Sequence, residues 1–533
     1  MPPINTNAEP VLNPLAPIEH LLHVLTTAAA GAALGLAVGS LSARAMRRAH
    51  LHWSWAVVAL VLLVVLRDLA GVAAPALAVG ALVAAVRGRS WHRADLETGG
   101  DLGELAASRH APSDLIPRLR AALCPRRAGW FRGRGLVLGR DERSRVVSIP
   151  FGGAGGRHTL VVGATGSGKT VTQSWIAARA VERGMGAIVV DPKGDAAMRE
   201  TMRAAADAAG RMFLEWTPHG ACAYNPYSAG SETEIADKAL AGERFTEPHY
   251  MRQAQRYLGH VVRTLRATGE EVSLRGIVEQ LDPDRLEVLA RSTPASAGQA
   301  TFDYLDSLTA RQRGDLAGVR DRLAILVESD VGPWLDTHTR GARSLDLPQA
   351  VNSRDVVYFN LEADRRPLVS QMLGAAIVQD LQTMVAAMQG RPVPTMVVID
   401  EFASLATEQV VRLFGRARSA GLSLLLGTQE LSDLRLPGRE RLLEQIVGNL
   451  SVLIAHRQVV PASAATIAAL AGTAGAWRVS RHSDGRAMRT RTRELVMDPS
   501  RVMSLGPGWG AVLVLEAPSS VRVARVLSAG DGR

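Results

Sequence analysis

Six short apolar runs mark the second part of the chain, and stretches with helical spacing separate most of them. Each run is long enough for one strand and shows little polar alternation, which is typical of strands buried on both faces of a parallel sheet. The pattern predicts an α/β fold with a mainly parallel sheet covered on both sides. The runs are residues 159–163, 187–190, 356–361, 396–399, 422–427 and 452–455.

Two further patterns extend this fold. Residues 228–345 show apolar positions at helical spacing, such as Ala254, Tyr257 and Val261, without strand-like alternation. They predict an inserted all-helical domain. The C-terminal stretch GAVLVLEAPSSVRVARV holds two apolar runs around a turn, which predicts a pair of antiparallel strands.

The N-terminal quarter has the pattern of a membrane anchor. Residues 21–41 carry one histidine and no charged residue, and about 20 helical residues cross a hydrocarbon core of about 30 Å. Gly31, Gly35 and Gly39 recur at every fourth position, so they would form a groove where another helix approaches closely. The first 20 residues contain no lysine or arginine, unlike a cleavable signal peptide.

A second apolar region covers residues 53–86 and is interrupted by Arg67 and Asp68. It would form one long tilted span, or two short helices that turn at this charged pair. Arginines follow both apolar regions, and the positive-inside rule places the segments that carry them in the cytoplasm. Both can be cytoplasmic only if the second region is a hairpin, so the number of spans stays open. These arginines are Arg44, Arg47, Arg48, Arg87, Arg89 and Arg93.

Composition adds two constraints. Basic residues outnumber acidic residues by 61 to 51, and the net charge of +10 suits phosphate-rich or anionic-lipid partners. Only three of the 61 are lysines, Lys169, Lys193 and Lys238, so lysine is either kept where a compact ammonium is needed or placed by chance. Two cysteines without a C-x-x-C pair make no disulfide framework and suggest no zinc site.

The strongest chemical signal is the stretch HTLVVGATGSGKT. An apolar strand runs into a Walker A pattern, and VTQSWIAARAVERG continues it as a helix. The glycines let the backbone curl around phosphate, where N–H groups and the helix N-terminus supply positive charge. Lys169 would bridge the β- and γ-phosphates, and Thr170 would ligate Mg²⁺. The predicted ATP-binding residues are Gly163, Ala164, Thr165, Gly166, Ser167, Gly168, Lys169 and Thr170.

A second element, TMVVIDEFASL, is an apolar run that ends in Asp400 and Glu401. Two adjacent acids at the end of a buried strand cost desolvation free energy unless a cation compensates for it. Asp400 is therefore expected to hold Mg²⁺, and Glu401 to polarise the water that attacks the γ-phosphorus.

A third element, GLSLLLGTQELSDL, places Gln429 at the end of an apolar strand. A neutral amide there would contact the γ-phosphate or orient the water without changing the local charge. Arg418, just ahead of this strand, is the candidate for an arginine that completes a neighbouring subunit's site in a ring. The alternative is an ordinary surface arginine.

Two arginine-rich stretches remain. Nine arginines between positions 118 and 145 would contact anionic lipid or nucleic acid. Six more, between positions 478 and 493, would form a loop that either grips nucleic-acid phosphates without reading bases or is merely solvated.

The motifs GATGSGKT, VVDPKGD, VVIDEFASL and GLSLLLGTQELSDL together resemble the coupling proteins of type IV secretion and conjugation systems. The resemblance covers residues 135–530 in motif order and implies a RecA-like fold. Members of the family commonly have two spans with a loop outside the cytoplasm, whereas the first loop here carries three arginines. The resemblance implies nucleotide-site roles for Lys169, Thr170, Asp400, Glu401 and Gln429, an arginine finger at Arg418, and a second finger candidate at Arg157.

The resemblance also implies a function. We expect a hexameric ATPase on the cytoplasmic face of a bacterial inner or plasma membrane that feeds single-stranded DNA, with its attached relaxase, into a secretion channel. The alternatives are an ATP-gated docking receptor for protein cargo that does not pump DNA, and a double-stranded DNA segregation translocase. The expected domains are a membrane anchor (1–94), a basic juxtamembrane linker (95–134), a Walker A part (135–227), the inserted helical domain that recognises cargo or channel (228–345), and a Walker B and sensor part (346–533).

Overall fold

The computed structural model describes most of the chain in two compact units. The first unit contains the N-terminal helices and residues 474–494, and the second contains the large sheet and its helices. The described residues are 16–49, 51–65, 74–97, 129–152, 156–243, 245, 247–405, 407–435, 441–481 and 487–528.

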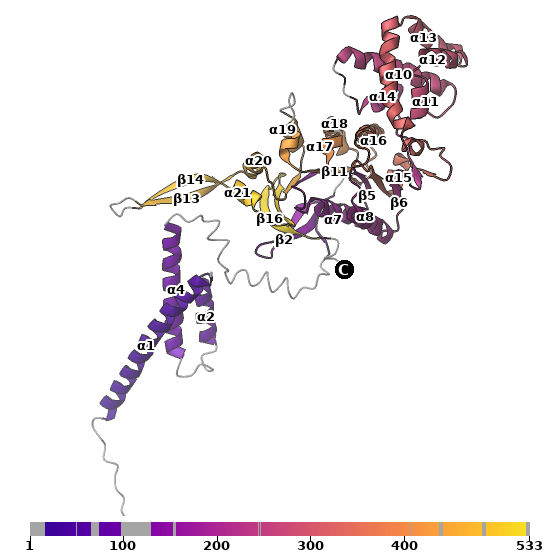
Figure 1. Cartoon of the computed structure of the whole chain (residues 1–533). Helices are drawn as coiled ribbons and strands as arrows, with labels where there is room; N and C mark the ends of the chain where they lie inside the picture. The colour runs from indigo at the N-terminus through magenta and orange to yellow at the C-terminus, as the bar shows by residue number, and fades with distance from the viewer. Residues whose placement is uncertain are drawn as a thin grey trace, which may run out of the picture. The chain divides into compact units, whose positions relative to one another are not determined.

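The second unit is built on a twelve-stranded sheet among the described residues (Figure 1). Its central strands run parallel in the order β12-β4-β11-β10-β5-β9-β6. All of them except β6 fall on the predicted apolar runs, which confirms the mainly parallel α/β fold. Their bounds are β4 Thr159–Val162, β5 Gly186–Asp191, β6 Phe213–Trp216, β9 Val356–Asn360, β10 Thr395–Ile399, β11 Leu422–Thr428 and β12 Val452–Ala455.

Antiparallel strands extend the sheet beyond β12. β15 (Trp509–Val514) pairs with β12 and with β16 (Ser520–Val526), which confirms the predicted C-terminal strand pair. β2 (Gly135–Asp141) then pairs with β16, and β1 (Phe131–Arg132) and β3 (Val146–Pro150) pair with β2. These three N-terminal strands were not among the predicted elements.

Helices cover both faces of the parallel strands. Successive strand residues point to opposite faces, so Leu160 and Val162 belong to one hydrophobic core and Val161 to another. The second core includes α7 (Lys169–Glu182) and α8 (Ala196–Ala208). The first core includes α16 (Pro367–Ala387), α18 (Thr407–Ala417) and α20 (Pro461–Ala471).

Between β7 (Cys222–Ala223) and β8 (Arg343–Ser344), the described residues form helices as their regular elements. Two of these helices, α9 and α14, begin with capping boxes, which satisfy N–H groups at the first turn. The apolar positions that predicted α10 are buried along one face of it. The exact domain bounds, 228–345, stay an interpretation. The helices are α9 Glu232–Leu240, α10 Pro248–Ala267, α11 Leu274–Glu279, α12 Pro283–Arg291, α13 Ala295–Asp306, α14 Ala310–Glu328 and η3 Gly332–Leu335.

In the first unit, α1 (Ala16–Arg48) packs along α4 (Ala74–Glu97). A Cβ added at Gly35 would lie 2.6 Å from the Ala76 carbonyl oxygen, and one at Gly39 would lie 2.4 Å from that of Gly80. The glycine groove predicted from the sequence is therefore filled by α4. Gly35 meets Ala76, and Gly39, four residues later, meets Gly80, also four residues later, so α1 and α4 run parallel.

One helix is compatible with a membrane crossing. Among the described residues, Leu21–Met46 is the one helix long and apolar enough to span a bilayer. The described residues of the region 53–86 include α2 (Ser54–Val65) and the first part of α4, which pack against each other and so do not form one long span. A second span there is not confirmed, because α2 is too short to cross by itself. Arg67, Asp68 and residues 98–128 of the basic linker lie outside the described residues.

The arginine-rich stretch near the C-terminus differs from its prediction. It was expected to be a loop, but β13 (Thr473–Arg481) and β14 (Ala487–Leu495) form a two-stranded sheet. In the sequence, Trp477 and Val479 alternate with Arg478 and Ser480, which is the period of a strand. The high arginine content concealed this alternation.

Candidate nucleotide-binding site

β4 leads directly into a glycine-rich loop that opens α7. Gly166 and Gly168 have φ angles of 75° and 109°, a left-handed backbone that glycine adopts without strain. Gly163 has no room for a side chain, since an added Cβ would lie 2.5 Å from Ser167 Oγ and 2.7 Å from His456 Cβ. The loop therefore has a backbone suited to surrounding a phosphate group.

Lys169 joins this loop to the acid pair. Its Nζ lies 2.9 Å from Asp400 Oδ1 and 2.6 Å from Glu401 Oε1, and all three residues are buried. Asp400 and Glu401 follow β10, which is separated from β4 only by β11. Because the carboxyl ends of parallel strands meet at one edge of a sheet, the two elements expected to share a metal ion come into direct contact.

The charges at this site compensate one another. Burial raises the pKa of Asp400 above its usual value, and the Lys169 ammonium offsets part of that rise. Burial acts in the same direction on Glu401, but Lys169, Lys193 and Gln429 together hold the pKa of Glu401 below its usual value. The buried acid pair is thus stabilised by the cations that contact it.

The sensor strand β11 brings Gln429 to the same carboxylate. Gln429 Nε2 lies 3.0 Å from Glu401 Oε1. Gly427, two residues earlier, lies against the acid pair: an added Cβ would be 2.4 Å from Asp400 Oδ1 and 2.5 Å from Gln173 Nε2. A glycine is required at this position if Asp400 is to keep its place.

Several buried polar atoms at the site lack protein partners. Ser167 Oγ and both polar side-chain atoms of Gln173 are buried and have no hydrogen-bond partner among the described residues. Such atoms are costly in a folded protein. Phosphate oxygens and a hydrated Mg²⁺ ion would supply the missing partners. With the glycine-rich loop, Lys169, Thr170 and the acid pair, these residues fit a magnesium nucleotide.

His456 supports the loop and was not found by the sequence argument. It follows β12, and its Nδ1 lies 2.9 Å from the Trp509 carbonyl oxygen while its Nε2 lies 2.8 Å from Thr172 Oγ1. Since a carbonyl oxygen only accepts, Nδ1 carries the proton and Nε2 accepts from Thr172. A single histidine after an apolar run gives no signal of this role.

Residues of the DPKGD stretch also belong to the site. Lys193 Nζ lies 2.8 Å from Glu401 Oε1. Asp191 accepts hydrogen bonds from the backbone N–H groups of Lys193 and Gly194, at 2.9 Å each. The sequence contained a signal for Lys193, because it is one of only three lysines, but that signal did not indicate a contact with Glu401.

The two arginine candidates lie at the opposite edge of the sheet. Arg418 precedes β11 and Arg157 precedes β4, whereas the carboxyl ends of these strands carry the nucleotide site. Arg418 Nη2 donates to the Asn449 carbonyl oxygen at 2.8 Å, and Arg157 forms an ion pair with Glu516. A role for Arg418 in a neighbouring subunit's site stays a prediction.

Comparisons with known proteins match the segments of the chain that carry this site. Residues 394–507 match the family model described as the TraM recognition site of TraD and TraG, and residues 141–199 match that of the central domain of the helicase HerA. No curated protein matches the chain by sequence.

Solved structures match its fold. The bacterial conjugative coupling protein TrwBdeltaN70 has a TM-score of 0.55 at 17% identity, covering 78% of this chain and 91% of that one. TrwB in complex with ADP and Mg²⁺ has a TM-score of 0.53 at 18% identity, covering 70% and 86%. VirB4 of Thermoanaerobacter pseudethanolicus has a TM-score of 0.50 at 14% identity, covering 76% and 99%.

The nucleotide-bound TrwB structures support a nucleotide and Mg²⁺ as ligands of this fold. The family models lie on the two segments that carry the Walker A loop and the acid pair. The resemblance to the TraD/TraG-type coupling proteins, first indicated by four motifs, is thus confirmed by a family model over the C-terminal part of the chain and by the fold of its RecA-like part.

Proposed function

We propose that the chain is a membrane-anchored ATPase that uses ATP hydrolysis to deliver DNA with an attached relaxase, or protein cargo, into a type IV secretion or conjugation channel. The contact of Lys169 with Asp400 and Glu401 carries this proposal, because it joins the two halves of a hydrolytic site. We further propose a hexamer on the cytoplasmic face of a bacterial inner membrane, held by the apolar helix Leu21–Met46.

Each site residue has a defined task in this proposal. The loop and Lys169 would bind the phosphates, and Thr170 and Asp400 would hold Mg²⁺, which would supply positive charge to the phosphate oxygens. Glu401 polarises the attacking water, and Gln429 orients it. Arg418 of one subunit would complete the site of the next.

DNA would be held by backbone electrostatics. The net charge of +10 and the six arginines of the 478–493 stretch favour contacts with phosphates. Such contacts bind DNA without reading its base sequence. Aromatic residues make up only 4% of the chain, so stacking platforms for bases are scarce.

The test is ATP hydrolysis by the full-length protein in detergent micelles, without DNA and with single- or double-stranded DNA. We expect single-stranded DNA to raise the rate several-fold and the Lys169→Ala variant to hydrolyse no ATP. A wild-type rate in that variant would refute the assignment of the loop. Stimulation by double-stranded DNA alone would favour the segregation translocase.

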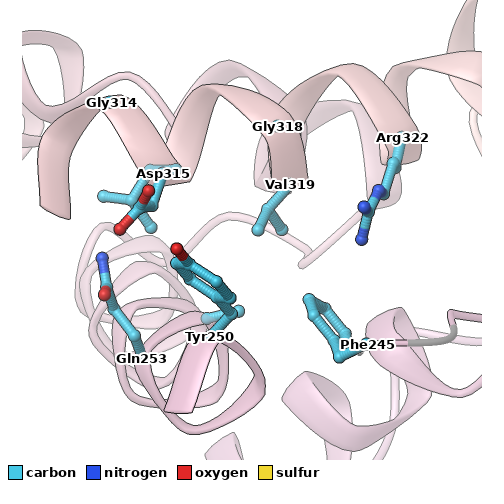
Figure 2. Close-up of a pocket in the computed structure, with 10 residues that line it drawn as sticks. Phe245, Tyr250, Gln253, Gly314, Asp315, Gly318, Val319 and Arg322 are labelled. Atoms are coloured by element: carbon cyan, nitrogen blue, oxygen red, sulfur yellow. The ribbon is translucent and has the colours of Figure 1, made fainter. Parts of the chain in front are cut away.

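One observation favours a second candidate, an ATP-gated docking receptor for protein cargo. A cavity of about 360 Å³ lies between the start of α10 and α14. Figure 2 shows Phe245 and Tyr250 across from the helix that carries Gly314 and Gly318. A Cβ added at either glycine would meet nothing within 4 Å, so the two glycines leave open space that a partner's side chain would fill.

Leucine substitutions at Gly314 and Gly318 separate the two candidates. The docking receptor requires that they weaken cargo-protein binding and cargo-stimulated hydrolysis, and that DNA leaves the hydrolysis rate of wild type unchanged. Gly259→Leu on α10 is the matched control, since an added Cβ there also meets nothing within 4 Å. If cargo proteins leave hydrolysis unchanged while DNA stimulates it, the motor is favoured.

A further inference from the structure

We propose that Lys193 is the positioning residue that holds Glu401 for hydrolysis. This inference rests on the proposed ATPase function and assigns a role to the lysine of the DPKGD stretch. Three donors end on one oxygen, Glu401 Oε1: Lys169 Nζ at 2.6 Å, Lys193 Nζ at 2.8 Å and Gln429 Nε2 at 3.0 Å. Only one of the two cations belongs to the phosphate-binding loop.

We expect Lys169 to leave Glu401 when it binds phosphates. It stands at the start of α7, at the end of the glycine-rich loop, where its ammonium would turn towards phosphate oxygens. Glu401 would then lose one of its two cations while only 11% of its side chain is exposed. A buried carboxylate without a cation is strongly disfavoured. Of the two lysines that contact Glu401 directly, Lys193 is the one that remains.

The position of Lys193 does not depend on the nucleotide loop. Lys193 follows β5, which pairs with β10, the strand that leads into Glu401. Asp191 is almost fully buried, accepts the N–H groups of Lys193 and Gly194, and also bonds to the Tyr358 hydroxyl. This loop therefore presents Lys193 to Glu401 from a fixed backbone.

The bonding pattern explains why a lysine stands here. The donors all end on Oε1, and none of these three bonds uses Oε2, which leaves that oxygen for the attacking water. A guanidinium favours two parallel bonds to both carboxylate oxygens, whereas an ammonium binds as a point charge. Arginine at this position would compete with the water for Oε2. The chain uses arginine 58 times and lysine three times, so an exception here is informative.

The backbone of Glu401 indicates a residue whose orientation matters. Its φ is 44°, in the left-handed region that side chains other than glycine rarely adopt. Strain of this kind persists where surrounding contacts hold a residue in one conformation. The bonds from Lys193 and Gln429 are two such contacts.

The experiment compares Lys193→Met and Lys193→Arg with wild type in the full-length protein, by steady-state ATP hydrolysis and by binding of a fluorescent ATP analogue. We expect both variants to lose at least about tenfold in kcat, with KM and analogue binding within about threefold of wild type. Arginine at position 193 should not restore kcat, although it keeps the positive charge. Arg365→Met is the matched control, because Arg365 is exposed and follows the neighbouring strand β9, and its ion pair among the described residues is a 3.7 Å contact with Glu362.

A chemical rescue adds a second readout. Alkylation of Lys193→Cys with bromoethylamine restores a compact ammonium at this position and should restore most of kcat, while the same treatment of wild type should change nothing. If Lys193 had a merely structural role, Lys193→Met would lower the melting temperature. We expect the melting temperature to be unchanged, because the Lys193 side chain is 47% exposed.

The outcomes separate this inference from the function on which it rests. If wild type hydrolyses ATP and Lys169→Ala does not, but Lys193→Met or Lys193→Arg keeps the wild-type kcat, the positioning role is wrong and the ATPase stands. A higher kcat in Lys193→Met would overturn the inference as well, since Lys193 would then restrain Glu401. If wild type hydrolyses no ATP, the proposed function and this inference fall together.

Discussion

Lys238 Nζ lies 2.5 Å from Asp380 Oδ1 and joins α9, the first helix after β7, to the core helix α16. The ammonium also donates to the carbonyl oxygens of Pro226 and Ala229, at 2.9 Å and 2.5 Å, and Tyr224 Oη donates to Asp380 Oδ2. A lysine has three donors, and all three are used here. Burial raises the pKa of Asp380 despite the ammonium beside it.

Removing one partner of this buried pair should destabilise the protein. Lys238→Met leaves Asp380 buried without a cation, which typically costs about 3–5 kcal/mol of unfolding free energy. Urea unfolding followed by tryptophan fluorescence would measure the loss. Replacing both partners, as in Lys238→Met with Asp380→Leu, should recover part of it. If the single variant unfolds at the wild-type urea concentration, the pair does not secure the helical segment to the core.

Gly427→Ala should impair hydrolysis more than stability. Its Cβ would meet the flexible ends of Asp400 and Gln173, which can move aside at small cost to folding but at the expense of the metal-binding geometry. We expect kcat to fall at least about tenfold and the melting temperature to change little. Gly415→Ala on α18 is the control, since nothing lies within 4 Å of its added Cβ. Equal rates in the two variants would contradict the account.

The parallel core was predictable from the sequence, and the contacts around the site were only partly so. Strands that are buried on both faces appear in the sequence as apolar runs. Each chemical motif follows the carboxyl end of such a run, so Lys169, Asp400 and Gln429 could be placed at one edge of the parallel sheet. The order of strands is not encoded locally. Lys193 reaches Glu401 because β5 pairs with β10, and His456 reaches Thr172 because β12 pairs with β4.

Stability should fall as the pH is lowered, because two buried histidines are neutral in the folded protein. Burial lowers the pKa of His456 from 6.5 to about 4, and burial together with Arg418 lowers that of His158 to about 3. Below pH 6.5 these histidines bind protons in the unfolded protein but not in the folded one, and this favours unfolding. The free energy of unfolding is therefore fully retained above pH 6.5 and falls as the pH is lowered towards 4. Each histidine contributes a slope of about 1.4 kcal/mol per pH unit in that window.

Urea unfolding at several pH values between 7.5 and 4.5 would measure this slope. His456→Gln keeps a neutral polar side chain that does not titrate. The slope of its unfolding free energy against pH should therefore be smaller by about 1.4 kcal/mol per pH unit, the contribution of one proton. Parallel curves for the variant and wild type would show that His456 does not remain neutral in the fold.

The packing of α1 against α4 should depend on Gly39 and not on Gly31. A Cβ at Gly39 would collide with the backbone of Gly80, whereas one at Gly31 would stand 4.0 Å from Ala76 Cβ. We expect Gly39→Ala to lower cross-linking between cysteines placed at Ala43 and Ala84 severalfold in membranes, because the helices must separate. Gly31→Ala should leave the yield unchanged. Equal yields would mean that α1 and α4 do not pack through this groove.

The central claim is that the loop ending in Thr170 and the acid pair at 400–401 form one hydrolytic Mg·ATP site. Glu401→Gln removes the water-polarising charge and keeps the shape of the side chain, so it separates binding from hydrolysis most directly. We expect this variant to bind Mg·ATP within about threefold of wild type and to hydrolyse it at least about 100-fold more slowly. Hydrolysis by Glu401→Gln at the wild-type rate would contradict this claim.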